Sequence, residues 1–128
     1  MRKTKLSITF LVLGLFIITQ NVLASWITQR LTWNSGESRD AAIAVDSLET
    51  IHIVWNDDSS GNKEIFYKKG LSGGSSWTTK RLTWNSGDSS YSSIAVDSNY
   101  HIFVIWQDNS SGNEEIYFKK SVDGGATW

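Results

Sequence analysis

The residue types best suited to bind a ligand occur in two similar stretches of the chain. W-N-S-G-E-S begins at position 33, and W-N-S-G-D-S begins at position 84. An indole ring can stack on the apolar face of a sugar while amides and carboxylates bond its hydroxyls. Packing of Trp33 and Trp84 against a neighbouring sheet is the first interpretation, and a carbohydrate site formed by these loops is the alternative. The residues expected to contact the ligand are Trp33, Asn34, Arg39, Asp57, Trp84, Asn85 and Asp108.

Arg39 is set apart from the other charged residues because it does not recur. Its counterpart 51 positions later is Ser90, whereas Arg30 recurs as Arg81. A repeated charge is typical of a structural pair, while a lone charge is a better candidate for a unique site. A solvated surface side chain is nevertheless the default expectation for Arg39, and a role in a site is the alternative.

Two oxygen-rich loops, residues 57–62 and 108–113, raise the question of a calcium site. Their spacing does not match the calcium loop D-x-[DN]-x-[DN]-G, and Asp, Asn, Ser and Gly are also ordinary turn residues. His52 and His101 are not repeat equivalents, so they do not indicate a paired metal site. We therefore expect neither a metal ion nor another cofactor.

An internal repeat organises these loops. When the sequence is shifted by 51 residues, about 29 of the 52 aligned pairs between residues 26–77 and 77–128 are identical. The seven tryptophans all fall on equivalent positions, which are 26, 77 and 128, then 33 and 84, then 55 and 106. A period near 50 with strand-like segments is typical of the blades of a β-propeller.

Each repeat divides at turn residues into four short strands. The central segments I-H-I-V-W and I-F-V-I-W are apolar at almost every position, as expected for strands covered on both faces. The sequence therefore predicts an all-β fold. The expected strands are residues 41–46, 50–56, 64–69 and 78–84 in the first repeat, 92–97, 101–107 and 115–120 in the second, and an isolated strand at 27–33.

Antiparallel strands bring alternate connections to the same end of a sheet. The loops 33–40, 57–63, 84–91 and 108–114 should therefore share one end, and the tight turns after residues 69 and 120 should share the other. Propellers generally bind ligands with loops gathered at one end, so the first set is where a ligand is expected.

The chain ends in the frame S-x-D-x-G-x-T-W. Its members are Ser121, Asp123, Gly125, Thr127 and Trp128, and a degenerate copy has Ser72, Gly74, Ser76 and Trp77. Glycine allows the tight turn and the aspartate can accept backbone N–H bonds. The motif resembles the Asp-box, or BNR repeat, of sialidase-like β-propellers, with Ser72 standing where the aspartate belongs and an echo at positions 25 and 26. A structural role for the box is expected.

The resemblance implies a propeller, in sialidases one of six blades. Those enzymes carry an arginine triad, an acid aspartate and a tyrosine nucleophile, with an Arg-Ile-Pro motif near the start of the domain. This chain contains no proline, and no catalytic residue of the family can be placed on it. Two interpretations follow: a non-catalytic propeller piece that binds a glycan or a protein, or the N-terminal part of a sialidase-like glycosidase whose catalytic residues lie in other blades.

The N-terminus predicts export. Basic residues at positions 2, 3 and 5 precede an apolar run over 6–18, and V-L-A ends at Ala24, so we expect a signal peptide over 1–24 and two repeats over 25–128. An uncleaved membrane anchor is the alternative. Removal of the three basic residues leaves 9 basic against 13 acidic, a net charge of −4, which disfavours nucleic acid and anionic membrane partners.

Two repeats fall short of a closed propeller, which needs about four to eight blades. The order of strands also leaves the first expected strand without a partner and the last sheet without its fourth strand. The sequence therefore indicates either a truncated protein or a unit that self-assembles, with residues 27–33 of one copy pairing with residues 115–120 of the next.

Overall fold

The computed structural model describes residues 27–128, so the expected signal peptide and the echo at positions 25 and 26 lie outside the described residues. The described chain is all-β and contains no helix, and therefore no helix able to cross a membrane. Its seven strands are β1 (Ser38–Val45), β2 (Ile51–Asp57), β3 (Glu64–Leu71), β4 (Ser76–Arg81), β5 (Ser89–Val96), β6 (Ile102–Asp108) and β7 (Glu115–Ser121).

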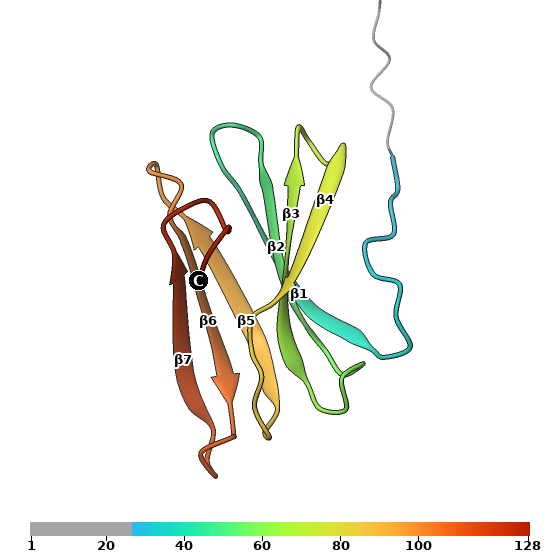
Figure 1. Ribbon diagram of the computed structural model, residues 1–128, viewed down its shortest axis with the longest axis vertical. Helices are drawn as coiled ribbons and strands as arrows, with labels where there is room; N and C mark the ends of the chain where they lie inside the picture. The colour runs from blue at the N-terminus through green and yellow to red at the C-terminus, as the bar shows by residue number, and fades with distance from the viewer. Residues whose placement is uncertain (1–26) are drawn as a thin grey trace, which may run out of the picture.

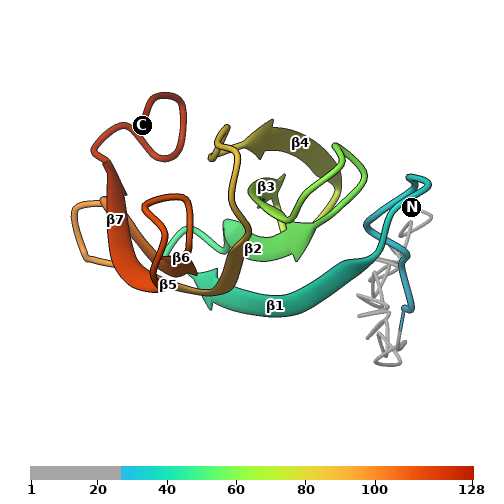
Figure 2. The same cartoon turned by 90° about the horizontal axis from the view of Figure 1, so that it is seen from below.

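The strands form two antiparallel sheets that follow the order of the chain. The first sheet has the order β1-β2-β3-β4, and the second has the order β5-β6-β7 (Figure 1). Every pair of neighbours is consecutive in sequence, so each sheet is a meander joined by short turns. Seen from below, the second sheet lies beside the first, and the N-terminal segment lies on the side of the first sheet away from the second (Figure 2).

The two sheets share an irregularity near the start of their first strands. The register between β1 and β2 shifts between Arg39 and Ala42, and that between β5 and β6 shifts at the equivalent place. Asp40 and Tyr91 carry the left-handed backbone there, with φ of 52° and 53°. This bulge lets β1 and β5 begin three residues before the strands expected from the sequence.

The strand β4 ends at Arg81, earlier than expected, because a side chain replaces the next backbone partner. Leu82 N donates to Ile65 O at 2.7 Å, and Ile65 N then donates to Thr83 Oγ1 at 2.8 Å. The prediction of a strand over residues 27–33 is wrong, since this segment forms none. A strand needs a neighbour that bonds its backbone, and no strand of the described chain pairs with this segment.

The core lies between the two sheets. It is built from Val54, Ile65, Tyr67, Leu82, Ile102, Val104 and Trp106. The first sheet contributes from β2, β3 and the residue that follows β4, and the second contributes from β6. Trp128 closes this core at the turn end, where its ring meets Tyr67 edge-on with 4.9 Å between the ring centroids.

Candidate functional site

The four loops expected to share one end do so, at the lower end of Figure 1. They are joined by hydrogen bonds across the boundary between the sheets. Asn62 Nδ2 donates to Asn85 O at 3.1 Å, and Lys63 N donates to the Asp88 carboxylate at 2.9 Å. Ser89 N returns a bond to Lys63 O at 2.8 Å. This end is therefore an ordered surface, fixed by backbone and amide groups.

A buried carboxylate organises the first pair of loops. Asp57 is 1% exposed and accepts bonds from Asn34 Nδ2 at 2.6 Å and Ser38 Oγ at 2.6 Å. Its other oxygen accepts the backbone N–H of Ser59 at 3.0 Å. Burial alone would raise the pKa of Asp57, but the bonds from Ser38, Ser59 and Asn34 outweigh it and lower the pKa to about 2.

The second pair of loops repeats this arrangement around Asp108. Asn85 Nδ2 and Ser89 Oγ donate to one carboxylate oxygen at 2.6 Å each, and Ser110 N donates to the other at 2.9 Å. Burial opposes ionisation here as well, yet the bonds lower the pKa of Asp108 to about 2. Sequence reasoning selected both Asn–Asp pairs, and the structure joins each pair directly.

Glycine makes the close approach of these loops feasible. A Cβ atom at Gly36 would lie 2.3 Å from Ser59 N, and one at Gly87 would lie 2.5 Å from Ser110 N. Any side chain at these two positions would push the loops apart. The W-N-S-G stretches are therefore fitted to the loops that follow β2 and β6.

The saturated carboxylates differ from the open ligand groups that the sequence suggested. Both oxygens of Asp57 and of Asp108 already accept bonds from protein donors. Such a group fixes the loop that carries Asn34 or Asn85, and its lone pairs point into the protein. The neighbouring tryptophans are the parts of these loops that meet solvent.

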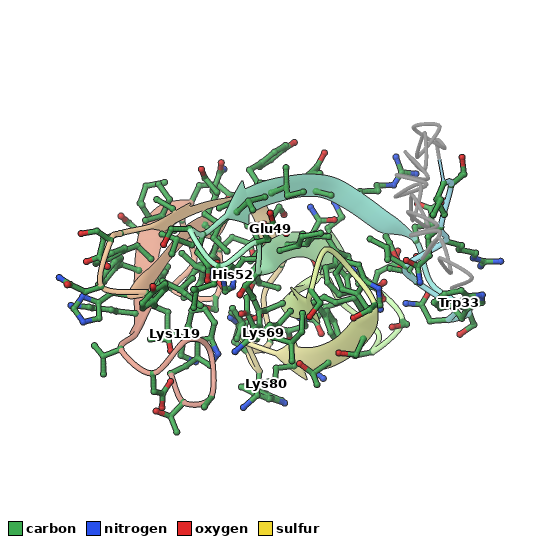
Figure 3. The ribbon with its side chains drawn as sticks, turned by 90° about the horizontal axis from the view of Figure 1, so that it is seen from above. Trp33, Glu49, His52, Lys69, Lys80 and Lys119 are labelled. Atoms are coloured by element: carbon green, nitrogen blue, oxygen red, sulfur yellow. The ribbon has the colours of Figure 1, made fainter. Side chains whose placement is uncertain are left out.

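Trp33 and Trp84 are each 67% exposed. Two cations approach each ring: Arg30 and Lys68 lie 5.9 and 5.7 Å from the centroid of Trp33, and Arg81 and Lys119 lie 5.7 and 5.6 Å from that of Trp84. Figure 3 shows Trp33 on the side of the first sheet that faces away from the second. The two tryptophans therefore belong to separate sites of similar make-up.

A groove of about 320 Å³ opens beside Trp33. Trp33, Asn34 and Thr32 from the N-terminal segment form one wall, and the first sheet supplies the other. The sheet residues that line this groove are Trp55, Phe66, Lys68 and Thr79, with Ser59 from the adjoining loop. It combines aromatic surface with hydroxyl, amide and ammonium groups, the combination that a sugar requires.

Lys68 separates this groove from a second cavity. The Lys68 ammonium donates to Leu31 O, and burial lowers its pKa. The second cavity measures about 240 Å³, and its lining includes Arg39, Ile53 and Trp55. Arg39 pairs with Glu37, both being exposed, so the structure does not bring it to Trp33.

The closing turn of the chain is held by one carboxylate. Asp123 accepts Thr127 N at 2.8 Å and Thr127 Oγ1 at 2.5 Å, while Ser121 Oγ donates to it at 2.7 Å. Gly125 N donates to Ser121 Oγ at 2.8 Å. The bonds from Thr127 and Ser121 hold the pKa of Asp123 well below its usual range. Gly125, with φ of 85°, lies against Tyr67, where no Cβ atom would fit.

The degenerate copy closes without a carboxylate. Gly74 N and Ser75 N donate to Leu71 O at 2.9 and 3.0 Å, and Ser72 takes φ of 46°. The ring of Trp77 covers Gly70 so closely that a Cβ atom there would lie 2.6 Å away. Ser76 begins β4 directly after this turn.

Of two buried polar clusters, sequence reasoning missed the one around His52 and expected the pairing of recurrent charges that forms the other. His52, 1% exposed, contacts Tyr67 Oη at 2.8 Å and Asp46 Oδ2 at 3.3 Å, and burial lowers its pKa. Glu64, fully buried, pairs with Arg81 at 2.7 Å. The recurrence of Glu and Arg in both repeats was the signal for the second cluster, whereas the second repeat has Phe103 in place of His52 and gave no signal for the first.

Within residues 27–128, no group of three His, Cys, Asp or Glu side chains is placed to hold a metal ion. Comparison of the chain with protein-family models, with curated proteins and with solved structures finds no match.

Proposed function

We propose that the chain is an exported, non-catalytic carbohydrate-binding piece of a sialidase-like Asp-box β-propeller. The blade assignment is supported by the repeat of about 51 residues, by two meander sheets that lie side by side, and by the S-x-D-x-G-x-T-W turn. Radial repetition of such sheets is how propellers protect their edges. Export is supported by the basic start, the apolar run and the V-L-A site.

The observation that carries ligand binding is the groove of about 320 Å³ beside exposed Trp33. The indole and Asn34 form one wall of the groove, and Ser59 and Thr79 offer hydroxyl groups from the other wall. Lys68 and Arg30 place positive charge near the ring. Sugars that carry a carboxylate are therefore favoured over neutral sugars.

Catalysis is not part of the proposal because the arginines of the described residues are occupied separately. Arg30 Nε donates to Thr32 O at 2.7 Å, Arg39 pairs with Glu37, and Arg81 pairs with Glu64. Three arginines that converge on one carboxylate are what the resemblance would require. The glycosidase alternative would therefore depend on further blades.

Titration calorimetry with acidic and neutral oligosaccharides tests the proposal. Trp33→Ala should weaken binding of an acidic oligosaccharide about tenfold, since stacking contributes roughly 1.4 kcal/mol. Trp84→Ala is the matched control, because Thr79 of β4 completes the groove beside Trp33 and, among residues 27–128, no strand lies at the equivalent edge of the second sheet. The wild type should release no sialic acid from a fluorogenic sialoside. Equal affinity of wild type and Trp33→Ala would contradict the proposal.

A further inference from the structure

The interface between the two sheets joins two different surfaces. The rear face of the first sheet consists of Ala42, His52, Val54, Ile65 and Tyr67, which share one side of β1, β2 and β3. The front face of the second sheet consists of Ile94, Val96, Val104 and Trp106, which share one side of β5 and β6. Residues from both faces build the core. The rear face of one sheet therefore packs closely against the front face of the next in this chain.

Among residues 27–128, the opposite surface of each sheet has no second sheet against it. The front face of the first sheet exposes Ile43 and Val45 at 64% and 58%, although their equivalents Ile94 and Val96 pack on the core. The rear face of the second sheet consists of Phe103, Ile105, Ile116 and Phe118. Ile116 and Phe118 are 71% and 58% exposed. The two open surfaces are thus repeat copies of the two surfaces that already fit together.

The cavity of about 240 Å³ lies on the open front face. Ile53 and Trp55 line it, and their equivalents Val104 and Trp106 are buried against the rear face of the first sheet. Ile65 of the rear face belongs to the same core as Val104 and Trp106, and the equivalent of Ile65 is exposed Ile116. An isoleucine presented by a rear face therefore matches the apolar lining of this cavity in chemistry.

Polar groups at the edges of these surfaces are complementary as well. Within the chain, Arg81 pairs with Glu64 at 2.7 Å across β4 and β3. Their equivalents are Arg30, whose guanidinium bonds only the Thr32 carbonyl among described residues, and Glu115, which is exposed and has no ion-pair partner among residues 27–128. Arg30 lies at one end of the molecule's two-sheet array and Glu115 at the other, so one chain cannot join them.

We propose that copies of this chain associate head to tail, with the front face of one copy on the rear face of the second sheet of the next. Residues 27–31 of one copy then pair with β7 of its neighbour as a fourth strand of that sheet. The register follows β3 and β4: Phe66 faces Arg81 there, so Tyr117 of one copy faces Arg30 of the next. The contact is heterologous, and two to four copies would close a ring of about four to eight sheets. It requires no bound glycan.

Charge reversal with rescue on mixing tests this association. In full-chain protein purified from the exported fraction, light scattering should give the wild type an integer multiple, two or more, of the single-chain mass. Arg30→Glu places two carboxylates at every contact, and Glu115→Arg places two cations there, so each variant alone should be monomeric. Mixed in equal amounts, the two variants should associate into pairs or larger even-numbered assemblies, because the carboxylate introduced at position 30 of one variant meets the guanidinium introduced at position 115 of the other.

Glu114→Lys is the matched control. It changes the charge beside Glu115 by the same amount, but the first repeat has Lys63 at this position within its own sheet contact, so assembly should persist. Far-ultraviolet circular dichroism separates loss of contact from loss of folding in the single variants. A wild type that is monomeric at all concentrations, or single variants that stay monomeric on mixing, would overturn the proposal.

Discussion

The first and second sheets place the same kinds of side chain on the same strands, yet these side chains meet different surroundings. Ile65 on β3 is fully buried, while Ile116 on β7 is 71% exposed. Tyr67 is 1% exposed, whereas its equivalent Phe118 is 58% exposed. The difference does not come from the size of the residues, since the first pair is identical and the second differs only by the Tyr67 hydroxyl.

The cause is what lies against each strand. The first sheet has β4 on one edge and the second sheet on its rear face, so Ile65 is enclosed between them. Within the described chain, the second sheet has no fourth strand at the edge of β7 and no sheet against its rear face. Burial in a repeat architecture is therefore a property of the junction between repeats, and a sheet face with no neighbour among the described residues exposes side chains that a face at a junction hides.

The loop networks show the opposite behaviour. Asp57 and Asp108 are both 1% exposed and receive the same set of donors at nearly the same distances. Each network needs only one sheet and the segment that precedes it, which both repeats possess. The two carboxylates thus provide an internal standard against which the difference between the sheets can be measured.

The largest expected effect is a difference in the free energy of unfolding between alanine variants of Ile65 and Ile116. Ile65→Ala should lower the free energy of unfolding by about 3 kcal/mol, because it leaves a cavity in the core. Ile116→Ala should lower it by less than about 0.5 kcal/mol in the single chain, since its side chain is exposed. Urea unfolding of the two variants in the monomeric Arg30→Glu background gives this comparison. Similar losses from both variants would show that β7 is covered in the single chain.

Much of this comparison was predictable from the sequence. The apolar segments and the turn residues predicted the all-β class and the central strands β2, β3, β6 and β7 to within about two residues. The common end of the four loops followed from antiparallel alternation. These features depend on local pattern, which a single sequence carries.

The remaining features depend on contacts that the pattern does not encode. The left-handed residues Asp40 and Tyr91 are not glycines, so the bulge that lengthens β1 and β5 had no sequence signal. The Thr83 hydroxyl that ends β4 acts through Ile65, which lies 18 residues away. The saturation of Asp57 likewise needed the structure, because an acidic residue in a polar loop resembles a ligand group until its donors are located.

A smaller loss of stability, equal in the two sheets, is expected when the pH is lowered until Asp57 and Asp108 take up protons. The pKa of Asp57 and of Asp108 is about 2 in the folded chain against an ordinary 3.8. Both carboxylates therefore stabilise the fold above pH 3.8, and this contribution is lost as the pH falls from 3.8 towards 2. Each is worth roughly 2 kcal/mol.

Asp57→Asn and Asp108→Asn should accordingly lower the free energy of unfolding by similar amounts at pH 7. The difference in the free energy of unfolding between each variant and the wild type should be smaller at pH 2.5, where the wild-type carboxylates begin to take up protons. Urea unfolding at both pH values measures this difference. A gap that is the same at pH 7 and pH 2.5 would show that the stabilisation does not come from the ionised carboxylates.

The smallest expected effect compares the two turns that follow β3 and β7. Asp123 accepts bonds from Ser121 and Thr127, whereas Ser72 at the equivalent place leaves its turn to backbone bonds onto Leu71. Asp123→Ala should lower the urea midpoint, and by less than Asp57→Asn, because Asp123 is exposed and water can replace the lost bonds. Ser72→Asp should raise the midpoint. Ser76 is the repeat equivalent of Thr127, so its backbone N–H and its hydroxyl are the donors expected to bond the new carboxylate. Ser72→Asn, which keeps the size and the turn preference of the side chain without its charge, separates the carboxylate from the backbone effect. If Ser72→Asn raised the midpoint as much as Ser72→Asp, the stabilisation would come from the preference of both side chains for the left-handed backbone at position 72. It would then not come from a carboxylate that closes the turn.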